Sequence, residues 1–169
     1  MIVAGSRSQV LASRLARAIG DELAEVEYDG FPVVASTPDD SAYVELLQIV
    51  DACGCGVDLV LPYMGYSRQD SRFEDGEPVT ARAVARGLPT SELGSRGSPA
   101  GWVETVTTVN LHEENVLDWF GVDDAAVETH DLDASPLLCR AVASEVESPV
   151  VLSPDSGAVD IARNSAESI

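Results

Sequence analysis

The 169-residue sequence contains no lysine, and its ten basic residues are all arginine. Against them stand 29 aspartates and glutamates, which give a formal net charge of −19. These acidic residues are spread through segments with periodic apolar residues and do not form one acidic tail. Such a folded surface repels itself at low ionic strength, so we expect a halophilic protein whose charges are screened by concentrated salt. The charge also argues against nucleic acid and anionic membranes as partners.

Cysteine is scarce as well. Cys53, Cys55 and Cys139 do not make an even set for disulfides, and the N-terminus lacks the basic and apolar regions of a signal peptide. No apolar run approaches the roughly 20 residues of a membrane helix. We therefore expect a cytoplasmic protein. The pair Cys53 and Cys55 could form half of a metal clip, but neither histidine is near it in the sequence, which favours small buried residues at a helix end.

Strands and helices are expected to alternate along the chain. With 45% hydrophobic residues, the length suits one domain, 1–169, with an apolar core. The predicted strands are Ile2–Ala4, Val33–Ser36, Val57–Tyr63, Thr105–Asn110 and Pro149–Leu152. The predicted helices are Ser8–Ile19, Asp40–Ala52, Glu77–Leu88, His112–Phe120, Ser135–Val146 and Ser156–Ser168. Alternation of this kind predicts an α/β fold with a mostly parallel sheet and helices on both faces.

Periodicity also predicts which helix residues share one face. In three helices these are Leu11, Leu15 and Ile19, then Val44, Leu47 and Val50, and finally Val116 and Phe120. The segment Pro89–Gly101 is rich in glycine, serine and proline without an apolar period, so we expect a flexible surface loop there.

The stretch Leu61–Thr80 joins a buried strand to a dense set of polar groups. Gly65 is expected to let the backbone turn sharply after the strand, and a helix is expected to open near Glu77-Pro78. Between them lie Arg68, Gln69 and Asp70, which offer a planar cation, an amide and a carboxylate. Because ligands bind beyond the carboxyl ends of parallel strands, this set predicts a site for an anionic, heterocyclic ligand.

Two further blocks, VNLHEEN at 109–115 and VLSPDSGAVDIA at 151–162, again join a predicted strand to a helix. Together with PYMGYSRQD, EPVTA and the opening strand, turn and helix, they resemble the ribose-phosphate pyrophosphokinase family. The resemblance covers most of the chain and implies a phosphoribosyltransferase-like fold. It also implies the family reaction, in which diphosphate passes from Mg-ATP to ribose 5-phosphate to make phosphoribosyl pyrophosphate for nucleotide biosynthesis.

The resemblance implies roles for five residues. Arg68, Gln69 and Asp70 correspond to the ATP-binding segment, while His112 and Asp155 correspond to residues associated with Mg²⁺. Plainer interpretations stand beside these: an Arg68–Asp70 ion pair at the surface, a structural His112, and an Asp155 that caps the last helix.

Two other positions bear on the metal. Many members of the family carry aspartate where this chain has Asn110, which removes one carboxylate from the magnesium environment. His130, beside Asp131 and Asp133, is expected in a solvated loop, with a metal-bridging role beside the nucleotide as the alternative.

The sequence departs from the family in two places. After Tyr28–Pro32 a strand and the adenine-clamping turn are missing, and the family's catalytic lysine loop and ribose-phosphate loop would lie beyond Ile169. We therefore expect an N-terminal half without the catalytic half, unable by itself to make phosphoribosyl pyrophosphate. The alternatives are a non-catalytic regulatory subunit of an intact synthetase and an unrelated Mg-nucleotide binding module. The expected partners are ATP, ribose 5-phosphate, and either further copies of the chain or a full-length homologue.

Overall fold

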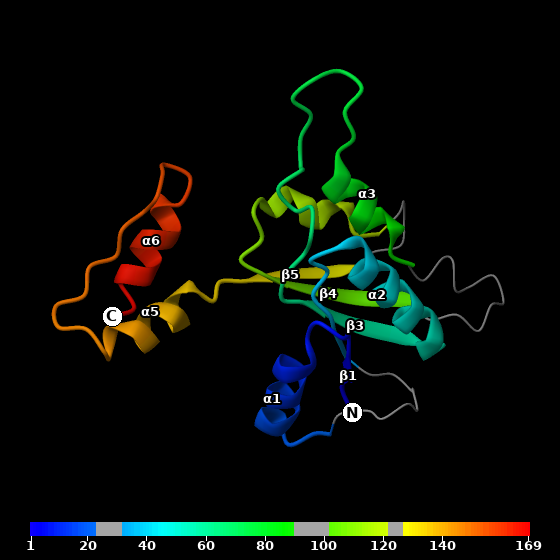
Figure 1. Ribbon diagram of the computed structural model, residues 1–169, viewed down its shortest axis with the longest axis horizontal. Helices are drawn as coiled ribbons and strands as arrows, with labels where there is room; N and C mark the ends of the chain where they lie inside the picture. Colours follow the sequence, from blue (N-terminus) through cyan, green and yellow to red (C-terminus); the bar gives the residue numbers. More distant parts are fainter. Residues whose placement is uncertain (23–31, 90–101, 122–126) are drawn as a thin grey trace. The chain divides into compact units, whose positions relative to one another are not determined.

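The computed structural model describes residues 1–22, 32–89, 102–121 and 127–169 (Figure 1). These residues form two compact units, Met1–Asp131 and Leu132–Ile169, and each is treated by itself. A single domain over 1–169 therefore stays a prediction. The predicted loop at 89–101, apart from Pro89, and the segment Tyr28–Phe31 lie outside the described residues.

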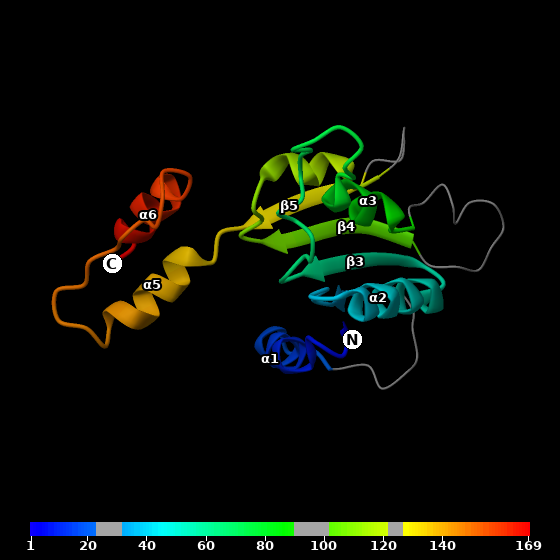
Figure 2. The ribbon, with the colours of Figure 1, turned by 45° about the horizontal axis from the view of Figure 1, so that its top comes forward.

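The first unit is built on a five-stranded sheet in the order β1-β2-β3-β4-β5. Strands β1 to β4 pair in parallel, and Figure 2 shows the arrow of β5 pointing the same way as those of β3 and β4. The predicted α/β fold with a parallel sheet is therefore confirmed. The strands are β1 (Val3–Ala4), β2 (Val33–Val34), β3 (Gly56–Leu61), β4 (Trp102–Val109) and β5 (Glu128–Leu132).

Helices cover both faces of this sheet, because alternate strand residues enter two separate apolar clusters. On one face Ile2 and Val34 pack with Ala12 and Ala16 of a helix. On the other face a larger cluster joins three helical segments to β1–β4. The helices of the unit are α1 (Gln9–Ile19), α2 (Asp40–Cys53), α3 (Thr80–Gly87) and the 3₁₀ helix η1 (Glu114–Trp119).

The predicted inward faces of α1 and α2 were wrong in part. Helix α1 buries Ala12 and Ala16, whereas Leu11 is 46% and Ile19 is 60% exposed. In α2, Val50 is buried as predicted, but Val44 is 50% exposed. Small alanines allow α1 to approach the sheet closely, so Leu11 and Ile19 face outward while Leu15 packs against the edge of the cluster. The predicted burial of Val116 in η1, and of Phe120 directly after it, is confirmed.

Three element predictions need correction. Helix α3 begins at Thr80 and not near Glu77, since the Glu77 carboxylate accepts hydrogen bonds from backbone N–H groups of the preceding turn. Residues 149–152 form no strand, and Val150 and Leu152 are 79% and 82% exposed. Strand β5 was missed because its sequence ETHDL has no apolar alternation that marks a strand.

The second unit contains α5 (Ser135–Ala143) and α6 (Val159–Ala166), which pack against each other. The Ser168 hydroxyl donates a 3.3 Å hydrogen bond to the Pro136 carbonyl and so ties the two helices together. Within the described ranges no helix is long and apolar enough to cross a membrane.

Ion pairs are few for so charged a chain. The described residues contain four, and one of these uses the N-terminal amine while another requires a protonated His130. Most of the acidic charge therefore has no basic partner and depends on solvent ions for screening.

We predict that the folded state is stabilised by molar salt. Because screening removes repulsion among like charges, a gain of about 3 kcal/mol in about 2 M KCl would raise the melting midpoint by about 10 °C. Circular dichroism during thermal unfolding measures this midpoint, and an uncharged osmolyte at equal osmolality is the control. Equal midpoints in dilute buffer and in molar KCl would contradict the halophilic interpretation.

Candidate functional site

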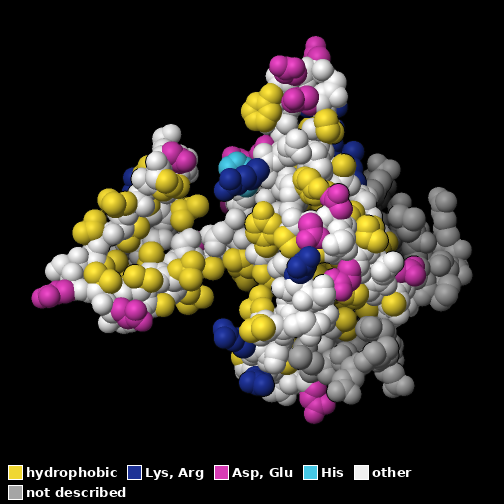
Figure 3. All heavy atoms as spheres, viewed as in Figure 1, with side chains coloured by type: hydrophobic (Ala, Val, Ile, Leu, Met, Phe, Trp, Pro, Cys, Tyr) yellow, Lys and Arg dark blue, Asp and Glu magenta, His cyan; other side chains and the backbone are white. Residues whose placement is uncertain are grey.

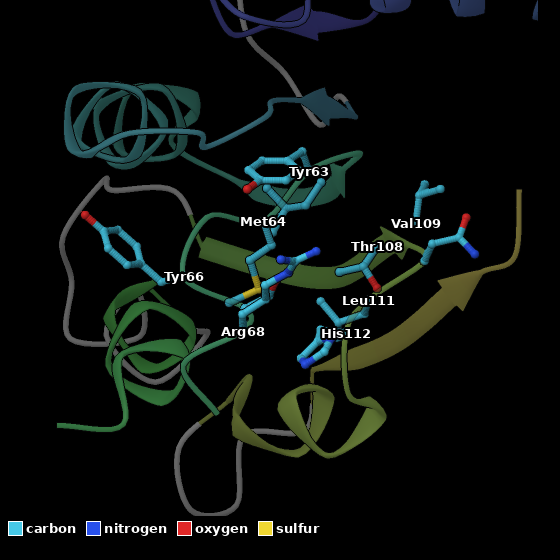
Figure 4. Close-up of a pocket in the computed structure, with 11 residues that line it drawn as sticks. Tyr63, Met64, Tyr66, Arg68, Thr108, Val109, Leu111 and His112 are labelled. Carbon is cyan, nitrogen blue, oxygen red and sulfur yellow. The ribbon is translucent and has the colours of Figure 1, made fainter. Parts of the chain in front are cut away.

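A cavity of about 380 Å³ lies at the carboxyl ends of β3 and β4, where a parallel α/β sheet usually binds its ligand (Figure 4). Two segments line it, the loop that follows β3 and the loop that follows β4. The lining residues are Leu61, Tyr63, Met64, Tyr66, Ser67, Arg68, Thr108, Val109, Asn110, Leu111 and His112.

The loop after β3 is fixed by close contact with the end of β2. The Thr37 N–H donates to the Tyr63 carbonyl at 2.9 Å, and the Gly65 N–H donates to Thr37 Oγ1 at 3.1 Å. A Cβ on Gly65 would lie 2.1 Å from the Thr37 carbonyl oxygen. Gly65 is therefore required for close approach and not, as predicted, for the turn, since the left-handed residue is Tyr66 with φ 64°.

Two further anchors hold the segment that carries Arg68. The Tyr66 hydroxyl donates to the Asp40 carboxylate, and this hydrogen bond raises the pKa of Tyr66. The Gln69 N–H donates to the Tyr66 carbonyl at 2.8 Å, and the Gln69 carbonyl accepts from the Ala81 N–H of α3 at 3.2 Å. Arg68 is thus presented from a backbone fixed on both sides.

The loop after β4 is organised by Asp131 of β5. Its carboxylate accepts a 2.6 Å hydrogen bond from the Thr108 hydroxyl and 3.1 Å hydrogen bonds at both oxygens from the Leu111 N–H. These contacts hold the backbone on both sides of Asn110 and place His112 at the cavity. The sequence did not reveal this role, because Asp131 was expected in a solvated loop. The polar Thr108 inside a strand was the available signal.

Unusual backbone conformations gather at this cavity. Among the described residues, three other than glycine have positive φ, and two of them, Tyr66 (64°) and Asn110 (48°), line it. Such conformations cost free energy and persist where surrounding contacts enforce them, as they commonly do at binding sites. The surrounding contacts therefore hold both loops in defined backbone conformations at the cavity.

The structure brings together two of the five predicted site residues. Arg68 and His112 both line the cavity and are exposed to solvent, whereas Gln69 and Asp70 do not line it (Figure 4). The ion pairs of the described residues do not include Arg68 with Asp70. The Arg68 guanidinium is thus available to a ligand, and the ligand roles of all five residues stay predictions.

Asp155 lies in the second unit. Its Oδ1 accepts hydrogen bonds from the Gly157 N–H at 2.9 Å and the Ala158 N–H at 3.1 Å, just before α6 begins. These contacts close a turn ahead of the helix, whose N-cap is Ala158 without a side-chain cap hydrogen bond, so the interpretation of Asp155 as the helix cap is wrong. A metal could still bind the second carboxylate oxygen, so the magnesium role stays a prediction.

The described residues contain no group of three or more histidine, cysteine, aspartate or glutamate side chains placed to hold a metal. His130 lies in β5 and not in a loop, with Nε2 3.1 Å from Glu128 Oε1. Cys53 is buried at the end of α2, and burial raises its pKa to about 11. Its thiolate is therefore disfavoured, as expected for a structural residue.

Comparison with known proteins gives a consistent result. A family model described as the N-terminal domain of ribose phosphate pyrophosphokinase matches residues 31–91. The ribose-phosphate pyrophosphokinase of Halobacterium salinarum is 41% identical over 184 positions, which cover 96% of this chain and 60% of that protein. The enzyme of the same name from Methanosarcina mazei is 37% identical, over 98% of this chain and 57% of that protein.

The crystal structure of phosphoribosylpyrophosphate synthetase from Mycobacterium smegmatis shares the fold, with a TM-score of 0.74 at 24% identity. The match covers 99% of this chain and 60% of that chain. The chain therefore spans about 60% of the length of the relatives it matches. The alignment with the Halobacterium protein has 184 positions against 169 residues here, so that relative carries residues without a counterpart in this chain.

We predict that Asp131→Ala loosens the loop after β4. It removes a charged acceptor of hydrogen bonds from Thr108 and Leu111, so we expect a stability loss of about 1.5–3 kcal/mol and faster amide exchange at Leu111. Chemical unfolding and hydrogen exchange measure the two effects. Asp118→Ala is the control, because it removes one exposed acidic charge from η1. Unchanged protection of the Leu111 amide in Asp131→Ala would show that Asp131 does not hold this loop.

Proposed function

The chain belongs to the ribose-phosphate pyrophosphokinase family, and on this premise we propose that the cavity at the ends of β3 and β4 binds the nucleotide donor, Mg-ATP. In the family reaction this donor gives its diphosphate to ribose 5-phosphate. The single observation that carries the proposal is that Arg68 and His112, from separate loops, line one cavity at the carboxyl edge of a parallel sheet.

Arg68 suits the phosphate end of a nucleotide. Its planar guanidinium presents several N–H donors that can bind phosphate oxygens in pairs, and it remains charged at every relevant pH. In a chain of net charge −19, an anionic ligand is repelled by most of the surface, so a cation inside the cavity decides whether the ligand stays. The ligand's phosphates should therefore lie against Arg68.

Magnesium would reach the site with the nucleotide. Among the described residues that line the cavity, His112 is the one histidine and there is no aspartate or glutamate. Mg²⁺ prefers oxygen ligands and commonly retains water together with substrate phosphates. We therefore propose that the phosphates hold the ion, that it lowers their negative charge, and that His112 hydrogen-bonds a phosphate or a metal-bound water. A magnesium role for Asp155, which belongs to the other unit, is proposed from the family resemblance alone.

The base end of the ligand would contact aromatic side chains. Tyr63 and Tyr66 line the cavity and are 58% and 43% exposed, so their rings offer stacking surfaces. Stacking accepts every base because every base has a π-face. We therefore propose weak discrimination between ATP and GTP. Transfer to ribose 5-phosphate and association with further copies or a full-length homologue are proposed from the family resemblance alone.

We predict magnesium-dependent binding of ATP, with GTP bound almost equally. Arg68→Ala should weaken ATP binding by about 1.5–3 kcal/mol, which is roughly ten- to 150-fold in the dissociation constant. Calorimetry in molar KCl measures this, and Arg86→Ala on α3 controls for the loss of one positive charge. Unchanged affinity in Arg68→Ala, or a strong preference for ATP over GTP, would show that the site is placed wrongly.

We also predict that His112→Ala and Asp155→Ala reduce the dependence of ATP binding on magnesium and leave most of the metal-free affinity. Titrations of each variant with and without Mg²⁺ give the ratio of the two dissociation constants. If the ratio of the two dissociation constants in both variants equals that of the wild type, neither residue contributes to magnesium binding.

A further inference from the structure

The short connection between β2 and α2 holds the loop after β3 along consecutive residues. We call residues 37–40 the β2–α2 connection. The loop residues that it contacts are Tyr63, Met64, Gly65 and Tyr66. Most of these line the cavity, whereas Thr37 and Asp40 are not among its described lining residues. The connection therefore shapes the cavity from outside it.

Thr37 holds the first half of this loop segment. It is 3% exposed and forms an isolated parallel bridge with Met64. Its N–H donates to the Tyr63 carbonyl at 2.9 Å, and its hydroxyl accepts from the Gly65 N–H at 3.1 Å in a buried setting. A buried N–H that loses its acceptor costs free energy. The Thr37 hydroxyl therefore fixes where Gly65 can lie.

Asp40 holds the second half of the segment. It lies in the first turn of α2 and accepts the hydrogen bond of the Tyr66 hydroxyl. Tyr66 has a left-handed backbone with φ 64°, which is unfavourable for a residue with a side chain and persists where surrounding contacts enforce it. Here the side chain of Tyr66 is held by Asp40, and the residue before it is held by Thr37.

The connection is itself fixed, so it can hold another segment. Asp39 caps α2, and its carboxylate accepts hydrogen bonds from the Ala42 N–H at 3.0 Å and from the Ser41 hydroxyl. The same carboxylate pairs with Arg7 at 3.0 Å. These contacts fix the start of α2, and with it the position of the Asp40 carboxylate.

The turn that follows Tyr66 carries Arg68. The Gln69 N–H donates to the Tyr66 carbonyl at 2.8 Å, so Arg68 lies inside a closed turn. A change of φ at Tyr66 therefore redirects this turn and moves the guanidinium from the cavity. Arg68 is the one arginine among the described lining residues, and the arginine side chains visible in Figure 3 are scattered over the surface. Another arginine of the described lining cannot take the place of a displaced Arg68.

We propose that Thr37 and Asp40 are positioning residues for the nucleotide cavity. They act through Gly65 and Tyr66 and keep the turn in the backbone conformation that presents Arg68 to the phosphates. The proposal rests on the proposed function of the cavity and adds two residues to it. Without either anchor the loop populates conformations in which Arg68 is withdrawn. The apparent dissociation constant then rises by the inverse of the fraction that remains competent.

Calorimetry with Mg-ATP in molar KCl tests the proposal with matched pairs of whole-chain variants. Thr37→Val removes the hydroxyl at nearly constant volume, whereas Thr37→Ser keeps the hydroxyl. Asp40→Ala removes the acceptor, whereas Asp40→Asn keeps an acceptor oxygen for the Tyr66 hydroxyl. We expect Thr37→Val and Asp40→Ala to weaken binding about five- to thirtyfold, the left-handed penalty expressed as a population, and the two conservative variants to bind almost as the wild type does.

The Arg68→Ala background separates positioning from a general loss of stability. If Asp40 acts through Arg68, adding Asp40→Ala to Arg68→Ala causes no further loss of affinity. Tyr66→Phe removes the same hydrogen bond from its other end and should weaken binding as Asp40→Ala does. Asp51→Ala is the control, because it removes one exposed carboxylate from the far end of α2.

Hydrogen exchange at the Gln69 amide reports on the turn without a ligand. We expect faster exchange in Thr37→Val and Asp40→Ala than in Thr37→Ser and Asp40→Asn. Circular dichroism checks folding, and the Asp40 pair carries the test if Thr37→Val does not fold.

Unchanged ATP affinity in Thr37→Val and Asp40→Ala, while Arg68→Ala weakens binding, would overturn the proposal. So would an equal further loss when Asp40→Ala is added to Arg68→Ala. Unchanged affinity in Arg68→Ala itself would contradict the proposed function of the cavity. In that case equal Gln69 exchange in all variants would overturn the positioning role as well, and faster exchange in Thr37→Val and Asp40→Ala would support it.

Discussion

The pairing of β3 with β4 is the constraint on which the site depends. Their register runs from Gly56–Trp102 to Leu61–Thr108, so both strands end at one edge of the sheet. The register shifts between Val57 and Asp58, which leaves Glu104 without a partner in β3. Beyond this bulge Val106 returns to the larger core and Thr108 becomes buried, where its hydroxyl reaches Asp131. A local irregularity in one ladder thus positions the loop that carries His112.

Several carboxylates of the described residues accept hydrogen bonds from backbone N–H groups. Arginines are few, so most carboxylates have no cation nearby. A nearby backbone N–H group then stabilises a carboxylate more than a distant arginine does. Asp39, for example, accepts from the Ser41 hydroxyl and the Ala42 N–H, and these hydrogen bonds lower its pKa. The same pattern holds turns or loops at Glu45, Glu77, Asp131 and Asp155. An acidic protein can therefore be well ordered with few ion pairs.

The distribution of positive charge follows from this scarcity. Arg68 lies at the cavity beyond β3 and β4, and Arg14 lies in the second turn of α1. A cation surrounded by acidic surface attracts anions selectively, because all other directions repel them. The proposed nucleotide site uses this effect at Arg68.

The sequence by itself determined the alternation of strands and helices, the parallel sheet, the family, and the two loops that supply Arg68 and His112. These features follow from local sequence patterns. The carboxyl ends of parallel strands meet at one edge of the sheet in any such fold, which places the two loops together. It did not reveal β5 or Asp131, because an edge strand with polar alternation resembles a loop. It also misassigned the buried stripe of α1 and the role of Gly65. Only the tertiary structure decided those points, because they depend on how closely Ala12 and Gly65 approach segments distant in the chain, a distance that no periodicity encodes.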